Sequence, residues 1–308
     1  MRRGVKGLKT GTRPLLWSAA ALLLLLSVAV PVVNMVTIML LLVPFAVLYV
    51  ILPVGSFAVH VAAVWFAAFV IMGPAALMIG FFFIVPAFVM GELYRRKTAA
   101  RTVMTGVTLT LLGLFLLELA ALSFIFDIQL IGEMGRLIRR NFESLADEGL
   151  LPTDVWTPDM TEILIDSMVA SLPMALIVIS FIYAAFSHWA ARRALLKSGV
   201  EVPAFRQAKD WMLPRTFVLY YLIVIVLDFL TPEQDGSFLS VVVINLLPLL
   251  RFAFTVQAIG FFFFLAAQKK WHRSVPLLLA VPVLLFPPLS LIGVLDVAFP
   301  IRKSFVRP

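Results

Sequence analysis

The stretch that decides the fold is residues 14–91, PLLWSAAALLLLLSVAVPVVNMVTIMLLLVPFAVLYVILPVGSFAVHVAAVWFAAFVIMGPAALMIGFFFIVPAFVMG. It contains no Asp, Glu, Lys or Arg. A membrane-spanning helix needs only about 20 apolar residues, so this stretch is long enough for several. It predicts consecutive transmembrane helices and therefore a polytopic membrane protein.

Composition extends this prediction to the whole chain. Of the 308 residues, 62% are hydrophobic and 14% are charged, whereas soluble domains are nearer half apolar and a quarter charged. We expect an all-α, polytopic integral membrane bundle of about eight or nine transmembrane helices. These helices would form a single membrane domain over residues 1–308 in contact with the lipid bilayer.

Prolines, glycines and charged loops divide the chain into expected spans. The spans cover about residues 15–30, 33–50, 56–71, 75–90, 102–126, 163–189, 214–230, 238–267 and 276–299. The last is interrupted by Pro287-Pro288. Its length favours a crossing, whereas a re-entrant hairpin would keep Arg302, Lys303 and Arg307 on the basic side.

Charge bias predicts the orientation, because cytoplasmic loops are enriched in Lys and Arg. The N-terminus (Arg2, Arg3, Lys6, Lys9, Arg13) and the loops at residues 92–101 and 190–215 are basic, and are expected to be cytoplasmic. Residues 127–162, from Asp127 on, hold eight acids against three bases and are expected on the outer side. The net charge of +8 then reflects topology, and no nucleic-acid partner is expected.

The outer loop contains a helical pattern. Ile131, Met134, Ile138, Phe142 and Leu145 recur at steps of three and four residues. This period predicts an amphipathic helix around residues 130–146. It is expected to lie on the membrane surface or to cap the bundle.

Two ionisable residues lie inside expected spans, where a charge costs about 2.5–3.5 kcal/mol on insertion scales. They are Glu118 and Arg251, and we predict that they pair. Asn245 is expected at a depth close to that of Glu118, and Asp228 is a second candidate partner for Arg251. Two interpretations stay open: an ion pair that only fixes helix register, or a ligand-binding site formed by these four residues.

Other chemistry is sparse. The chain has no cysteine, and its three histidines, His60, His188 and His272, have no metal-ligand spacing. His60 is expected to be a hydrogen-bonded packing residue, and His188 and His272 to be anchors at the membrane interface. No nucleotide-binding, zinc-protease or serine-hydrolase motif is present. We therefore expect no catalytic residues, no cofactor and no enzyme activity.

Three short motifs carry a resemblance to a known family. They are MGELYRR at residues 90–96, FRQAKDWMLPR at 205–215 and GVLDVAFPIRK at 293–303. With these motifs the chain resembles the YybS-like family of uncharacterised bacterial membrane proteins. The N-terminal half of that family is similar to the S-components of energy-coupling-factor vitamin transporters. The resemblance implies a small-molecule uptake role in the bacterial plasma membrane.

Two functions follow as hypotheses. The first is a small-molecule binding or uptake subunit, similar to an S-component and working with partner subunits. The alternative is a non-transporting scaffold for envelope-related assembly, which recruits a protein partner or anionic lipid through the basic loop at residues 190–215. A cavity with polar groups would favour the first, and a solidly packed bundle the second.

Overall fold

The computed structural model describes residues 11–124, 129–150, 157–231, 237–272, 274–299 and 301–305. Every regular element within these residues is helical, so the predicted all-α class is confirmed. The basic residues before position 11, Asp127 at the start of the predicted outer loop, and Arg307 lie outside the described residues. The chain divides into two compact units, formed by residues 1–128 with 176–205 and by residues 129–175 with 206–308.

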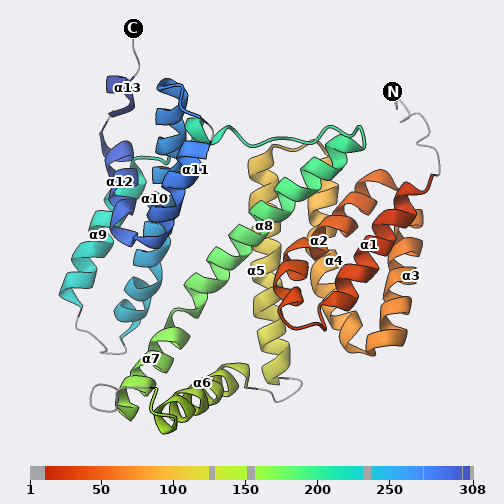
Figure 1. Cartoon of the computed structure of the whole chain (residues 1–308), viewed down its shortest axis with the longest axis horizontal. Coiled ribbons are helices and arrows are strands. Elements are labelled where there is room, and N and C mark those ends of the chain that lie inside the picture. The colour runs from red at the N-terminus through yellow and green to blue at the C-terminus, as the bar shows by residue number, and fades with distance from the viewer. Residues whose placement is uncertain are drawn as a thin grey trace. The chain divides into compact units, whose positions relative to one another are not determined.

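Unit 1 is a bundle of six helices, which Figure 1 labels. They are α1 (Arg13–Ser27), α2 (Val33–Ile51), α3 (Val54–Met72), α4 (Ala75–Arg95), α5 (Ala100–Phe124) and most of α8 (Leu172–Lys197). Helix α2 packs against both α1 and α4. Every residue from Leu41 to Tyr49 is buried, as expected of a helix that is apolar on all sides.

Helices α2 and α4 approach closely at one end. A Cβ atom at Gly91 would lie 2.6 Å from Cδ1 of Tyr49, so only glycine allows this approach. Arg95 then donates to the carbonyl oxygens of Tyr49 and Leu52 at the end of α2. Its guanidinium carbon lies 4.1 Å from the centre of the Tyr49 ring. The last carbonyl groups of a helix have no N–H donor within that helix, and here Arg95 supplies the hydrogen bonds to two of them.

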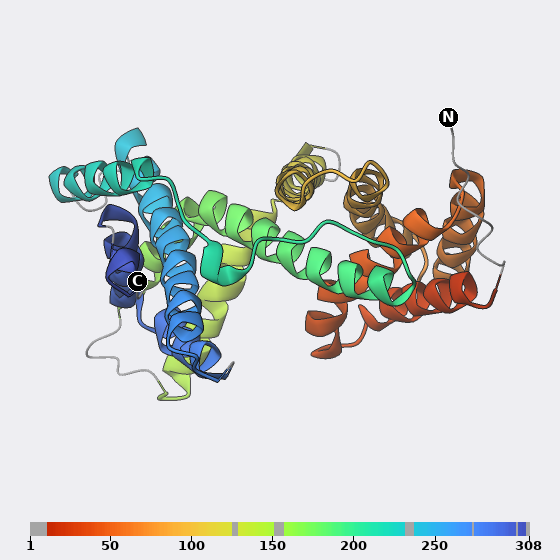
Figure 2. The ribbon, with the colours of Figure 1, turned by 90° about the horizontal axis from the view of Figure 1, so that it is seen from above.

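Unit 2 is organised around α10 (Phe238–Gln268), with other helices packed on it (Figure 2). These are α9 (Thr216–Leu230), α11 (Ser274–Leu285) and α12 (Ser290–Ala298). The short 3-10 helices η1 (Ala208–Asp210) and η2 (Pro287–Leu289) also contact α10, and α13 (Ile301–Phe305) follows α12. The remaining helices of this unit are α6 (Leu130–Asp147) and α7 (Pro158–Ala170).

The predicted amphipathic helix is present as α6. It packs its apolar side on α7, where Gly135 faces Ile165: a Cβ atom at Gly135 would lie 3.3 Å from Cγ2 of Ile165. A bidentate ion pair closes the same contact, because Arg139 donates to both carboxylate oxygens of Glu162 at 2.7 and 2.8 Å. Outer-surface placement of α6 stays a prediction.

The predicted span at residues 163–189 is not one helix. Helix α7 ends at Ala170, and α8 begins at Leu172. Pro173 accounts for the break, because proline has no N–H and its ring crowds the carbonyl of the preceding turn. The side chain of Asn245 supplies the missing partners: its Nδ2 donates to Ala170 O at 2.8 Å, and its Oδ1 accepts from Met174 N at 2.9 Å.

The tail of the chain forms a hairpin. Gly293 of α12 lies against Phe254 of α10, and Phe305 of α13 lies against Phe261 further along α10. Helix α12 therefore runs parallel to α10, and α11 before it leads away from the end of α10 (Figure 1). The chain turns at the Pro287-Pro288 pair, so residues 276–299 follow the path of the hairpin alternative. The side of the membrane on which this tail hairpin lies stays a prediction.

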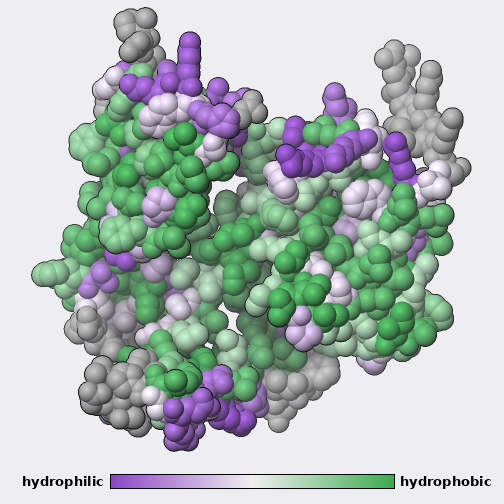
Figure 3. All heavy atoms as spheres, viewed as in Figure 1, coloured by the Kyte–Doolittle hydropathy of each residue, from purple (hydrophilic) through white to green (hydrophobic). Residues whose placement is uncertain are grey.

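Six of the described helices are long and apolar enough to cross a membrane: α2, α3, α4, α5, α8 and α10. Helices α1, α9, α11 and α12 are apolar but shorter, so the number of spans stays a prediction. Hydrophobic residues cover the middle of each unit, and hydrophilic residues gather at both ends of unit 2 and at the end of unit 1 near the C-terminus of α8 (Figure 3). Large apolar side chains such as Phe124 and Phe229 are exposed, which suits contact with lipid.

Candidate functional site

A cavity of about 280 Å³ opens within unit 1. Apolar side chains from α2, α4, α5 and α8 form most of its wall, and three phenylalanines (Phe82, Phe83 and Phe115) contribute rings. Two polar side chains reach it. They are Glu118 of α5 and Tyr183 of α8. The cavity therefore combines aromatic faces, one hydroxyl and one carboxyl group.

Glu118 is the only charged residue in the wall of this cavity. Its side chain is half-buried. Within the described residues of unit 1, no basic side chain forms an ion pair with it. Tyr183 is engaged, because its hydroxyl donates to the carbonyl oxygen of Ile38. Glu118 is thus a charged group in the cavity wall that has no ion-pair partner among the described residues of unit 1.

The other predicted site residues lie in unit 2. Arg251 of α10 and Asp228 of α9 are exposed, and no ion pair joins them within the part of the chain that the structure describes. Asn245 uses its amide to bridge the break between α7 and α8. Because Glu118 and Arg251 belong to different units, their pairing stays a prediction, as does ligand binding by these four residues.

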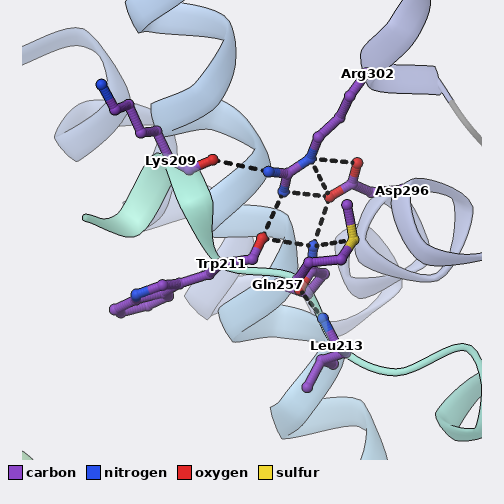
Figure 4. Close-up of polar contacts among 7 residues, drawn as sticks. Lys209, Trp211, Leu213, Gln257, Asp296 and Arg302 are labelled. Carbon is purple, nitrogen blue, oxygen red and sulfur yellow. Dashed lines mark hydrogen bonds and ion pairs between the residues drawn. The ribbon is translucent and has the colours of Figure 1, made fainter. Parts of the chain in front are cut away.

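Sequence reasoning missed a buried polar cluster in unit 2 (Figure 4). Arg302 of α13 donates to Asp296 of α12, with Nη2 2.7 Å from Oδ2 and Nε 2.9 Å from Oδ1. It also donates to the carbonyl oxygens of Lys209 and Trp211. Gln257 of α10 donates to Asp296 Oδ2 at 2.6 Å.

This cluster joins three distant parts of the chain: the segment around η1, the middle of α10 and the tail. The side chain of Asp296 is fully buried, and that of Arg302 is 14% exposed. The carboxylate of Asp296 is matched by the guanidinium of Arg302, and these contacts hold the tail against α10 and the segment around η1. One feature of the sequence could have indicated this cluster: Asp296 is an acidic residue inside an expected span, where a charge needs a partner.

The histidines differ in their surroundings. His60 Nδ1 lies 2.8 Å from Ser18 Oγ, as expected of a hydrogen-bonded packing residue. The interface-anchor prediction for His188 is wrong, since this side chain is only 1% exposed. One residue on, Trp189 is exposed, because successive side chains of a helix point about 100° apart. His272 is exposed, and its role as an interface anchor stays a prediction.

Comparisons with known proteins agree with the helical membrane architecture. The family model described as "Predicted membrane protein (DUF2232)" matches residues 18–297. The chain is 22% identical over 299 residues to "Uncharacterized protein YybS" of Bacillus subtilis (strain 168), covering 94% of this chain and 96% of that protein. No solved structure matches. Likeness to S-components stays an expectation from the sequence.

Proposed function

The chain belongs to the family of predicted membrane proteins DUF2232, and on that premise we propose that it is a small-molecule binding or uptake subunit. Its ligand site is the cavity of unit 1. The ligand is a small, mainly apolar molecule that carries one positive charge. The observation that carries the proposal is the single carboxyl group of Glu118 in an otherwise apolar and aromatic wall.

Electrostatics supports a cationic ligand. A carboxylate in apolar surroundings loses hydration, and a counter-charge offsets this cost. No basic side chain of unit 1 supplies that charge within the described residues. The rings of Phe82, Phe83 and Phe115 add faces that attract an ammonium group. A primary or secondary amine on a short apolar body meets all of these features.

Size supports a small ligand. Ligand pockets commonly measure about 300–1,000 Å³, and this cavity lies just below that range at about 280 Å³. It suits a molecule of one ring with a short amine arm. Larger cofactors are too big for it.

Benzylamine is a suitable probe, with benzyl alcohol as its uncharged counterpart. Protein in lipid nanodiscs is titrated with each, and binding is followed by calorimetry or native mass spectrometry. We expect benzylamine to bind more tightly than benzyl alcohol. The preference should disappear in Glu118→Gln and persist in Glu143→Gln, which alters an exposed acid on α6. Equal binding of benzylamine by the Glu118→Gln variant would refute the proposal.

Location and orientation form part of the same proposal. We place the protein in the bacterial plasma membrane with its N-terminus in the cytoplasm. The support is the excess of bases at the N-terminus and at residues 92–101 and 190–215. A reporter fused to the N-terminus, active only in the cytoplasm, tests the orientation. The chain has no nucleotide-binding motif, so active uptake would draw on an ion gradient or on partner subunits.

One observation favours the scaffold alternative. The guanidinium carbon of Arg193 lies 4.7 Å from the centre of the Trp189 ring, and both side chains are exposed near the end of α8. Tryptophan and arginine together suit an interface with anionic headgroups. If benzylamine does not bind, and anionic lipid co-purifies with the wild type but not with Arg193→Ala/Lys197→Ala, the scaffold function is favoured.

A further inference from the structure

Helix α8 carries a row of buried polar side chains on the face that packs into unit 1. The row consists of Ser180, Tyr183, Ser187 and His188, which recur at helical spacing. Ser180 and Ser187 have no exposed surface, His188 is 1% exposed and Tyr183 is 7% exposed. Polar groups so placed in an apolar bundle are costly and usually serve a function.

Three atoms of this row lack a hydrogen-bond partner in the described part of the protein. They are Oγ of Ser180, Oγ of Ser187 and Nε2 of His188. Buried polar side chains are nearly always hydrogen-bonded. Where no protein group serves, ordered water is the usual partner. The row is therefore suited to a chain of water molecules.

The row meets the cavity at Tyr183. Tyr183 lines it together with Glu118, and a water molecule occupies only about 30 Å³ in the liquid. The cavity thus has room for several waters between the carboxyl group of Glu118 and the row. Apart from Glu118, Tyr183 is the only titratable residue in the wall of the cavity, and the residues contributed by α2 and α4 are apolar.

One end of the row reaches the end of a helix. His188 Nδ1 lies 2.8 Å from the hydroxyl of Tyr94, the last residue but one of α4. Phe205 packs against the His188 ring, with ring centres 4.7 Å apart. Arg192 lies one turn further along α8, and its Nε donates to the carbonyl oxygen of Val202 at 3.3 Å. Glu92, in the last turn of α4, and Arg96, just after that helix, form an ion pair close to Tyr94 in the sequence.

We propose that the polar row of α8 is a hydrated proton path between Glu118 and His188. His188 follows Tyr183 by five positions, which corresponds to about 7.5 Å of rise along the helix. Two or three hydrogen-bonded waters span this distance. A proton released by the carboxyl group of Glu118 passes along the waters, each accepting one proton and giving up another. Nε2 of His188 accepts it, Nδ1 passes its own proton to the hydroxyl oxygen of Tyr94, and that hydroxyl releases a proton to water at the end of α4.

The path uses the same cavity as the proposed function but not its ligand. Proton exchange through His188 would change the protonation state of Glu118. Because only the charged carboxylate attracts a cation, cation binding would then be coupled to proton movement along α8. The proton gradient would then act on this site. Proton movement and benzylamine binding are separate measurements, so either proposal can fail without the other.

The test is proton flux into proteoliposomes that contain a pH-sensitive dye, driven by a potassium diffusion potential. We expect the wild type to acidify the interior faster than protein-free vesicles. Glu118→Gln and His188→Gln should reduce the flux to the rate of protein-free vesicles. Ser187→Ala should give an intermediate rate. His60→Gln is the matched control, because His60 lies in unit 1 outside the row, and should keep the wild-type rate.

Glutamine at position 188 can still bond to Tyr94, so the variant should keep the thermal midpoint and the benzylamine binding of the wild type. A structural role for His188 would lower the midpoint and leave the flux per folded protein unchanged. That result would overturn the proposal. So would a wild-type flux no faster than that of protein-free vesicles, or an undiminished flux in His188→Gln.

Discussion

The guanidinium of Arg302 forms a bidentate ion pair with the buried carboxylate of Asp296, with Nε 2.9 Å from Oδ1 and Nη2 2.7 Å from Oδ2. Six residues separate the two along the chain, and the contact spans the junction between α12 and α13. Arg302 also donates from Nη1 to the carbonyl oxygen of Lys209 and from Nη2 to that of Trp211. This pair therefore fixes the tail against the segment that precedes α9.

Breaking this pair should destabilise unit 2. Removal of one partner from a buried ion pair commonly costs about 3–5 kcal/mol, because the other charge stays buried and unpaired. We expect Arg302→Met to lower the thermal midpoint strongly and Asp296→Leu/Arg302→Met to recover part of the loss. The control is Arg136→Ala, which breaks an exposed pair with Glu133 worth about 0–1 kcal/mol. Equal losses in both single variants would contradict the assignment.

Gly293 should not tolerate a side chain. A Cβ atom there would collide with the backbone carbonyl of Phe254 in α10, and backbone cannot move aside as a flexible side chain can. Overpacking of this kind costs about 1–3 kcal/mol. Gly293→Ala should lower the thermal midpoint measured by tryptophan fluorescence. Gly113→Ala, where no atom lies within 4 Å of the new Cβ, should leave it unchanged or raise it.

Asn245 should stabilise the chain locally at the break between α7 and α8, which its side chain bridges. Asn245→Leu leaves Ala170 O and Met174 N without their side-chain partner, and a buried unmet group costs about 1–3 kcal/mol. We expect faster hydrogen exchange at residues 170–175 in this variant. Asn141→Leu, on the exposed side of α6, is the control. Unchanged hydrogen exchange at residues 170–175 would show that the side chain of Asn245 does not stabilise the break.

The contact between α6 and α7 should weaken in acid. The hydrogen bonds from Arg139 hold the pKa of Glu162 below its ordinary value of 4.5. A lowered folded-state pKa means that the ion pair stabilises the folded form fully above about pH 4.5, and that this contribution is lost as pH falls through the lowered pKa. Hydrogen exchange in α6 should rise in that range. Glu162→Gln should remove the pH dependence, and the exposed position keeps the effect small.

The sequence-based pairing of Glu118 with Arg251 is the alternative to a cation site at Glu118, and it yields its own prediction. Glu118→Gln should reduce the amount of protein in the membrane, because Arg251 would lose its counter-charge. Addition of Arg251→Gln should restore part of it. Western blots of membrane fractions measure both variants, and additive losses in the double variant would exclude the pair.

Much of the architecture followed from residue order alone. The absence of charge from residue 14 to residue 91 specifies membrane helices, because hydropathy acts on each segment separately. Pro53 and the Gly73-Pro74 pair lie between observed helices. The amphipathic period that begins at Ile131 predicted α6 to within a residue at each end. These are local signals, read from neighbours along the chain.

The direction in which a polar side chain points depended on tertiary structure. His188 and Trp189 are adjacent in sequence, yet one is buried and the other exposed. Asp296 finds partners 39 residues away in Gln257 and six residues away in Arg302. Glu118 meets a cavity walled by helices from across unit 1. Hydropathy sets which segments enter the membrane, but the packing of helices against one another decides which face is buried, and that requires contacts between residues distant in sequence.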